Sequence, residues 1–164
     1  MQKFKLIIGL GNPSTGSGRV PDKYENTYHN VGHLFVDFLG KGTKSDVFMN
    51  QSGKFVKEAL KKHKIKPENL LVVHDDSDIE LGCYKLSFGR NSAGHRGVQN
   101  IIDQLKTKNF WRLRIGIRPH SALRATPSKP RPTADELVLK HITPANGKKL
   151  ERAFKEAAKV ATLL

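Results

Sequence analysis

One apolar run that ends in charged residues constrains the fold of this chain more than any other stretch. The range Leu70–Val73 contains no polar residue, and it leads directly into His74 and Asp75, with further carboxylates close behind. Such a run is typical of a strand that is buried on both faces. We expect the strand to end at Val73, so that these polar groups lie at its carboxyl end, where open α/β sheets bind ligands. Taken alone, the same stretch fits a solvated acidic turn equally well.

Other apolar segments alternate between strand-like and helix-like patterns. The ranges expected as strands or helices are 4–10 (strand), 31–40 and 55–60 (helices), 83–88 (strand), 98–105 (helix), 111–117 (strand) and a last helix from Pro144, capped by Thr143. Strands that alternate with helices predict an α/β sheet with helices on its faces, within one domain over 1–164. The range 118–133 is basic and rich in proline, and we interpret it as a mobile loop.

The charge of the chain indicates a polyanionic partner. Its 29 Lys and Arg residues against 15 Asp and Glu residues leave a formal net charge of +14. Nucleic acid and anionic membranes are the usual partners of such a field, but no apolar run approaches the roughly 20 residues of a membrane span. The single cysteine, Cys83, forms no internal disulfide and fits a reducing compartment, for which we expect the cytoplasm, with an organelle as the alternative. The histidines show no metal-ligand spacing, so we expect no metal.

Polar residues remain at the ends of several predicted elements. They are Asn12, His29, Asn50, Asp75 and the loop that holds His95 and Arg96. A histidine oriented by an aspartate is a general base, and asparagine amides can stabilise a developing oxyanion. No serine or cysteine occurs in a G-x-S-x-G elbow, which favours attack by water over a covalent intermediate.

Each of these residues also has a purely structural interpretation. His29 would bond a backbone carbonyl at a helix start, Asp75 would be a turn carboxylate, Asn12 would form an Asx turn before Pro13, Asn50 would cap the following helix, and His95 would be structural. The stretch Gly9-Leu10-Gly11 suggests a nucleotide loop only weakly, because it has neither the G-x-G-x-x-G spacing nor a P-loop lysine.

Several motifs in order along the chain resemble those of bacterial-type peptidyl-tRNA hydrolases. They are Gly-Leu-Gly-Asn-Pro at 9–13, Tyr24-x-x-Thr-x-His29-Asn30-x-Gly32, Phe48-Met49-Asn50-x-Ser52-Gly53, His74-Asp75, Gly94-His95-x-Gly97 and Arg112-Leu-Arg114-Ile-Gly-Ile117. The resemblance covers nearly the whole chain. It implies a monomeric α/β domain with a mixed, largely parallel twisted sheet. It also implies cleavage of the ester between a peptide and the 3′ end of tRNA, without metal or cofactor.

The resemblance also implies roles for single residues. Carried over by motif, His29 is the general base and Asp75 its partner, Asn12 and Asn50 contact the substrate, and Tyr24 and Met49 line the same cleft.

The chain departs from the family pattern at several places. Arg96 stands where the family usually has an asparagine, and we expect it to bind a substrate phosphate or carbonyl. Tyr28 replaces an arginine. The range 40–47 spans a gap in which family members typically have further strands, so the sheet should be smaller, with an exposed edge. The basic loop over 118–133 is longer than the usual lid.

The phosphate clamp of the family is also altered. Its lysine corresponds to Ser87, and Lys85 on the same strand face is the expected substitute, while Arg114 retains the other half of the clamp for tRNA phosphates.

Competing functions follow from these observations. The first is peptidyl-tRNA hydrolysis, supported by His29, Asp75, Asn12 and Asn50. The alternative is an RNA-binding protein on the same fold with little or no hydrolysis, which Arg96, the short 40–47 segment and the charge favour. A weaker hypothesis is a nucleotide enzyme that uses Gly9-Leu10-Gly11.

Overall fold

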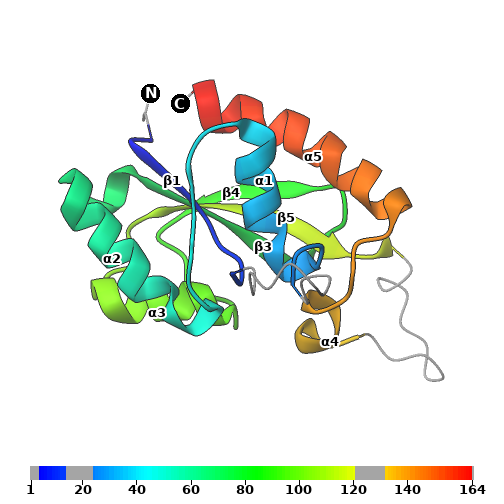
Figure 1. The fold of residues 1–164 in the computed structure, drawn as a ribbon, viewed down its shortest axis with the longest axis horizontal. Helices are drawn as coiled ribbons and strands as arrows, with labels where there is room; N and C mark the ends of the chain where they lie inside the picture. Colours follow the sequence, from blue (N-terminus) through cyan, green and yellow to red (C-terminus); the bar gives the residue numbers. More distant parts are fainter. Residues whose placement is uncertain (1–3, 14–23, 121–131, 164) are drawn as a thin grey trace, which may run out of the picture.

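A twisted sheet with helices on both faces organises the chain (Figure 1). The structure is a computed structural model, and it describes residues 4–13, 24–120 and 132–163. Its strands are β1 (Leu6–Gly9), β2 (Thr43–Lys44), β3 (Leu70–Glu80), β4 (Tyr84–Phe88) and β5 (Trp111–Arg118). Its α-helices are α1 (Val31–Leu39), α2 (Ser52–His63), α3 (Arg96–Leu105), α4 (Ala134–Val138) and α5 (Pro144–Leu163). Short 3₁₀ turns precede α1, α2 and β3 at Tyr28–Asn30, Met49–Gln51 and Pro67–Asn69.

The sheet is five-stranded, with the order β2-β1-β3-β5-β4. β1 runs parallel to β2 and β3, and β3 runs parallel to β5. β4 is antiparallel to β5 because only a tight turn of chain separates β4 from the end of β3. The expected mixed, largely parallel sheet is therefore confirmed, and β3 lies at its centre.

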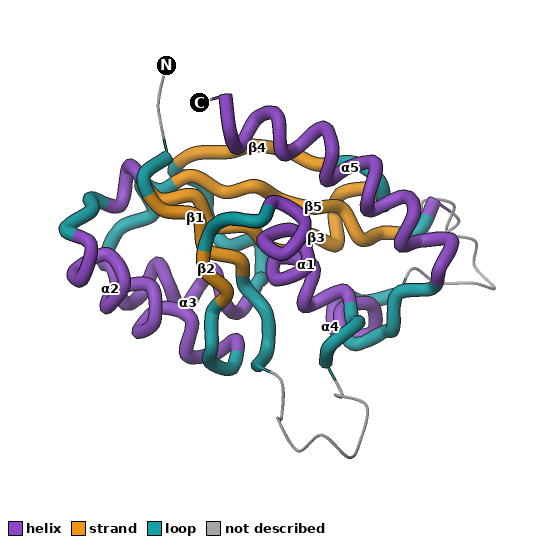
Figure 2. Tube along the Cα trace, turned by 45° about the horizontal axis from the view of Figure 1, so that its top comes forward, coloured by secondary structure: helices purple, strands orange, loops and turns teal. Residues whose placement is uncertain are grey.

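The burial of β3 on both faces is also confirmed. Leu71 and Val73 pack against α1 and α5, whereas Leu70 and Val72 pack against α2 and α3. Figure 2 shows the two helical layers on opposite sides of the sheet. Residues of a strand point to alternate faces, so a continuous apolar run is what a strand between two helical layers requires.

One expectation about the elements was wrong, and two elements were not predicted. β3 does not end at Val73 but continues to Glu80, because β5 pairs with it through Asp76 and again at Glu80. The polar range 40–46 contains the edge strand β2, which pairs with β1 although both of its residues are exposed. A short helix, α4, follows the basic loop. Most of the predicted mobile loop, 121–131, lies outside the described residues.

Local signals account for the boundaries of several helices. α1 ends at Gly40, which adopts a left-handed conformation with φ of 66°. α5 begins at Pro144, and the Thr143 hydroxyl accepts a hydrogen bond from the Asn146 N–H, as predicted. In the described part of the chain, no helix has the length and apolar character needed to cross a membrane.

Candidate active site

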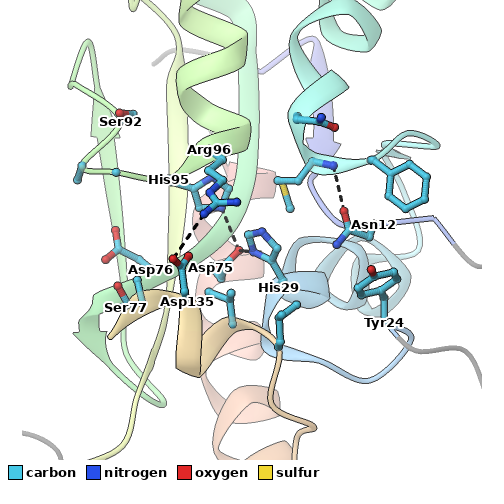
Figure 3. A pocket seen from close by; sticks show the side chains of 18 of the residues that line it. Asn12, Tyr24, His29, Asp75, Asp76, Ser77, Ser92, His95, Arg96 and Asp135 are labelled. Carbon is cyan, nitrogen blue, oxygen red and sulfur yellow. Dashed lines mark hydrogen bonds and ion pairs between the residues drawn. The ribbon is translucent and has the colours of Figure 1, made fainter. Parts of the chain in front are cut away.

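A cleft of about 760 Å³ lies beyond the carboxyl end of β1 and beside the second half of β3 (Figure 3). It is bounded by the turn before α1, the turn before α2, the loop before α3, and α4. The predicted catalytic and substrate-binding residues all line it: Asn12, Tyr24, His29, Met49, Asn50, Asp75 and Arg96. The structure thus brings together residues that lie far apart in the sequence.

Close packing of α1 on the sheet places His29 beside Asp75. A Cβ added to Gly9 would lie 2.2 Å from the Gly32 carbonyl oxygen, and one added to Gly32 would lie 2.4 Å from that of Val73. Only glycine permits this approach of the helix to β1 and β3. The His29 Nδ1 atom then lies 3.0 Å from Asp75 Oδ1. His29 therefore bonds a carboxylate rather than a backbone carbonyl, and Asp75 is a strand residue rather than a turn carboxylate.

Asp75 has a second imidazole partner. The His95 Nε2 atom also lies 3.0 Å from Asp75 Oδ1, while His95 Nδ1 accepts the backbone N–H of Val98 at the start of α3. A ring nitrogen that accepts a hydrogen bond carries no proton, so the proton of neutral His95 is on Nε2 and is donated to Asp75. Both nitrogens of His95 are therefore engaged within the protein.

His74 completes a cluster of imidazoles around this carboxylate. Its Nδ1 donates to the Asp75 carbonyl oxygen at 2.7 Å, and its ring packs edge-on against that of His95. Its Nε2 is buried and has no partner among the described residues. Because His74 is fully enclosed and His95 is doubly bonded, only His29 leaves a ring nitrogen, Nε2, on the cleft side of the cluster within the described part of the chain.

The environment shifts the pKa values of the His29–Asp75 pair in opposite directions. Burial opposes charge on both groups, but their mutual attraction and hydrogen bond prevail. The pKa of His29 is consequently raised above 6.5, and the pKa of Asp75 is held well below its usual range by the imidazoles of His29 and His95. Burial, followed by the proximity of His95, lowers the pKa of His74 and keeps it neutral.

Asn12 presents a hydrogen-bond donor to the same cleft. Its backbone N–H and carbonyl are both held by the side-chain amide of Asn30, at 2.8 and 2.9 Å. Its own Oδ1 accepts the Met49 N–H at 2.9 Å. Since the oxygen of the amide is engaged, the Nδ2 group is the part available to a ligand. This long-range contact replaces the Asx turn that was one structural interpretation of Asn12.

The remaining predicted residues form the walls of the cleft. Asn50 is exposed in the 3₁₀ turn before α2, and the N-cap of α2 is Gln51, so Asn50 does not cap that helix. Tyr24 lies edge-on to Phe48, with ring centroids 6.5 Å apart, and together with the buried Met49 they give the cleft an apolar wall.

A separate cavity of about 570 Å³ contains the predicted phosphate contacts. Lys85 and Arg114 are paired across β4 and β5, and both line this cavity. Arg90, Arg112 and the buried hydroxyl of Ser87 join them. Burial and then the charge of Arg114 lower the pKa of Arg112 to about 10.

The imidazole–carboxylate cluster also has ligand atoms close enough for a metal ion. The donor atoms of His29, Asp75 and His95 all lie within 4.8 Å of one another. Sequence spacing could not reveal this group, because its members come from three separate segments. In the neutral tautomers assigned above, two imidazole protons occupy the space between these atoms, so the arrangement is satisfied as a hydrogen-bonded cluster.

Sequence reasoning treated two further polar residues of the cleft differently. His95 was expected to be structural, and both of its nitrogens bond within the protein, whereas Asp135 on α4 was not considered at all. The Arg96 Nη2 atom lies 3.5 Å from Asp135 Oδ2 across the cleft. A signal for α4 was present: Thr133 and Glu136 form a capping box, and this S/T-x-x-E spacing is readable in the sequence.

The fold and the site together define a class: an α/β protein in which a carboxylate-oriented imidazole faces a cleft that also offers an amide donor. Such a set can deprotonate a water molecule and stabilise the oxyanion that forms when the water attacks an ester.

Comparisons with known proteins agree with this class and narrow it. The family model for peptidyl-tRNA hydrolase matches residues 41–164. A peptidyl-tRNA hydrolase of Aquifex aeolicus is 33% identical, and the match covers 95% of this chain and 87% of that protein. One from Sulfurihydrogenibium is 38% identical over 139 residues, covering 70% of each. The chain therefore belongs to the peptidyl-tRNA hydrolase family.

Solved structures give the same result for the fold. The crystal structure of peptidyl-tRNA hydrolase from Acinetobacter baumannii superposes with a TM-score of 0.80 at 27% identity, covering 100% of this chain and 89% of that one. The resemblance of the motifs is thus matched by the whole backbone.

Proposed function

We propose that this chain hydrolyses the ester bond between a peptide and the 3′ end of tRNA, with His29 as general base. The observation that carries this proposal is the free orientation of His29 Nε2 toward the cleft while Asp75 holds Nδ1. Asp75 fixes the tautomer of the ring and stabilises the imidazolium that forms. His95 cannot replace His29, because Val98 and Asp75 engage both of its nitrogens.

The reaction uses the residues of the cleft in sequence. Nε2 of His29 removes a proton from water, and the water oxygen attacks the ester carbonyl carbon. The Nδ2 group of Asn12 donates to the oxyanion. The tetrahedral intermediate then expels the ribose oxygen, which takes the proton from the His29 imidazolium. The products are a tRNA with a free hydroxyl on its 3′-terminal ribose and a peptide carboxylate, and no covalent enzyme intermediate is needed.

The walls of the cleft suit the remaining parts of the substrate. Tyr24, Met49 and Asn50 contact the acyl group, for which the apolar surface of Tyr24 and Met49 is appropriate. Lys85 and Arg114 contact tRNA phosphates in the neighbouring cavity. Arg114 is held there by Asp76, whose Oδ2 accepts its Nε–H at 2.7 Å. Binding through phosphates should weaken as the salt concentration rises.

The competing hypotheses are less well supported. An RNA-binding protein without hydrolysis has no need for a buried carboxylate that orients an imidazole, yet the His29–Asp75 pair is intact. The glycines of the suggested nucleotide loop have a packing role: a Cβ on Gly9 would meet α1, and one on Gly11 would lie 2.8 Å from the ring of His33. The space beside both glycines is filled by other parts of the protein, so it is not open to a phosphate.

The decisive experiment is cleavage of an N-acetyl-aminoacyl-tRNA by the parent and by His29→Ala. Loss of a general base should lower kcat by about 10²–10⁴-fold. Binding of tRNA should persist, because its phosphates bind elsewhere. His63→Ala, which removes an exposed histidine from the end of α2, is the matched control. Cleavage by His29→Ala at the parental rate would refute the assignment.

The proposal also covers the oligomeric state, the compartment and the need for other groups. We expect the protein to act as a monomer in the cytoplasm and to need neither metal nor cofactor. Sedimentation of the purified protein at micromolar concentration would test the first expectation, and a stable dimer would contradict it.

A further inference from the structure

An ion pair spans the mouth of the cleft in front of the imidazole cluster. Arg96 is the first residue of α3, and Asp135 belongs to the first turn of α4. Figure 3 shows the two side chains pointing toward each other from opposite sides of the cleft, with Nη2 and Oδ2 3.5 Å apart. Their side chains are 75% and 79% exposed. Arg96 thus already binds an anionic group in the free protein, namely the carboxylate of Asp135.

Arg96 lies at the exposed mouth of the cleft, away from the buried residues that would attack the ester carbonyl. The side chains of His29 and Asp75 are 13% and 2% exposed, so the proposed chemistry takes place on the floor of the cleft. The guanidinium at the rim is placed for a group that adjoins the ester. That group is either part of the acyl chain or part of the terminal nucleotides.

The surroundings of Arg96 favour the nucleotides. The cleft and the cationic cavity share Ala93 in their linings, only a few residues before Arg96. The cavity that holds Arg90, Arg112 and Arg114 therefore adjoins the cleft close to the loop that leads into Arg96. The apolar wall of Tyr24 and Phe48 offers the acyl chain a better match than a guanidinium does. A cationic cavity next to a cleft that has its own arginine suits a strand with a phosphate at every nucleotide.

We propose that Arg96 binds a phosphate of the 3′-terminal nucleotides of the tRNA, and that Asp135 occupies this position in the free protein until the phosphate displaces it. This inference rests on the proposed function and names the substrate group that Arg96 recognises. An exposed ion pair at 3.5 Å is weak, whereas a phosphate offers a guanidinium two parallel hydrogen bonds. Replacement of Asp135 by the substrate phosphate as the partner of Arg96 is therefore favourable.

The test compares two short substrates that differ only in charge. One is an N-acetyl-aminoacyl ester of the trinucleotide CCA with phosphodiester links, and the other carries neutral methylphosphonate links. Arg96→Gln should lower kcat/KM for the charged substrate about tenfold relative to the neutral one, as the loss of a hydrogen bond to a charged group does. Arg96→Lys should restore part of this ratio. Asp135→Asn should change the ratio in the opposite direction through a lower KM.

Matched controls exist for both substitutions. Arg152→Gln removes an exposed arginine from α5, outside the linings of the cleft and the cavity. Asp37→Asn breaks another exposed ion pair, in which Lys44 lies 2.9 Å from Asp37. Neither control should alter the ratio between the substrates.

Binding of unacylated CCA, followed by fluorescence anisotropy, tests the same contact without hydrolysis. A parent that binds CCA through Arg96 but cleaves no ester would refute the proposed function and support the phosphate contact. Equal losses for both substrates in Arg96→Gln, or unchanged CCA binding, would overturn the contact. Weaker CCA binding by Asp135→Asn would overturn the role of Asp135 as a displaceable counter-ion.

Discussion

The floor of the cleft and the neighbouring cationic cavity use charge in different ways. On the floor, the Asp75 carboxylate is buried and accepts hydrogen bonds from His29 and His95. In the cavity, Lys85 and Arg90 are exposed, and none of the described residues that line it carries a carboxylate, although Arg114 is paired with Asp76 outside this lining. The two regions meet at Ala93. Groups that move a proton need fixed tautomers and therefore partners within the protein, whereas groups that bind a polyanion must keep their charge for the ligand.

The largest expected effect comes from the floor. Asp75→Asn keeps an oxygen that can accept the N–H groups of both His29 and His95, which now converge on the single atom Oδ1, but it removes the negative charge beside His29. We expect kcat to fall by about 10²–10⁴-fold, because the imidazolium of His29 that forms during the reaction would lose its counter-charge. Single-turnover cleavage of N-acetyl-aminoacyl-tRNA measures this effect. Retention of a large part of the parental rate, similar to that of Asp37→Asn, would contradict it.

Changes in the cationic cavity should act on binding. Lys85→Ala removes one phosphate contact, which should weaken tRNA binding about tenfold and reduce the slope of log K against log salt by about one. Ser87→Lys adds a cation on the same strand face and should have the opposite effect. Filter binding at several salt concentrations measures both. An effect of Lys85→Ala or Ser87→Lys on kcat rather than on KM would contradict the division between a binding cavity and a catalytic cleft.

The pH profile of hydrolysis should show how Arg96 and Asp135, at the mouth of the cleft, affect the pKa of His29. Hydrolysis requires neutral His29, whose pKa is raised, so the rate should increase with pH through a midpoint above 6.5. The charged or titratable groups around His29 are Asp75, His95, Arg96 and Asp135. Asp135 raises its pKa and Arg96 lowers it.

Asp135→Asn should therefore shift the midpoint of kcat/KM to lower pH, and Arg96→Gln should shift it to higher pH. The double variant should return close to the parent, because the two charges act on His29 in opposite directions. Both single variants moving the same way would show that the pair acts through structure rather than charge.

The smallest expected effect is that of a chelator. We expect EDTA to leave the rate of hydrolysis unchanged, since the neutral imidazole tautomers satisfy Asp75 without an ion. Added Zn²⁺ should inhibit, because the donor atoms of His29, Asp75 and His95 lie within 4.8 Å of one another. A loss of activity in EDTA that Zn²⁺ restores would make the cluster a metal centre.

Much of the architecture followed from local patterns. The apolar run at 70–73 predicted a strand buried on both faces, and all of its side chains are fully buried. Gly40 and Thr143 marked helix ends correctly. The residues with polar groups at element ends also proved to line one cleft. These successes share a cause, because hydrophobic periodicity and capping depend on residues within one or two turns of each other.

The misses share a cause too. β2 has no apolar signal and exists because β1 offers it an edge, and β3 extends past Val73 because β5 pairs with it. His95 reaches Asp75 because the chain turns through Ala93 and Gly94, which both have positive φ. No local pattern encodes these contacts, since each depends on a partner elsewhere in the chain.

The sequence by itself determined the α/β class, the central buried strand and the residue types of a His–Asp site. The tertiary structure decided which atoms of that site remain available: Nε2 of His29 rather than either nitrogen of His95, and Nδ2 rather than Oδ1 of Asn12. The physical reason is that a hydrogen-bonding atom becomes available or engaged only when distant segments pack against it. That packing also placed Asp135 opposite Arg96.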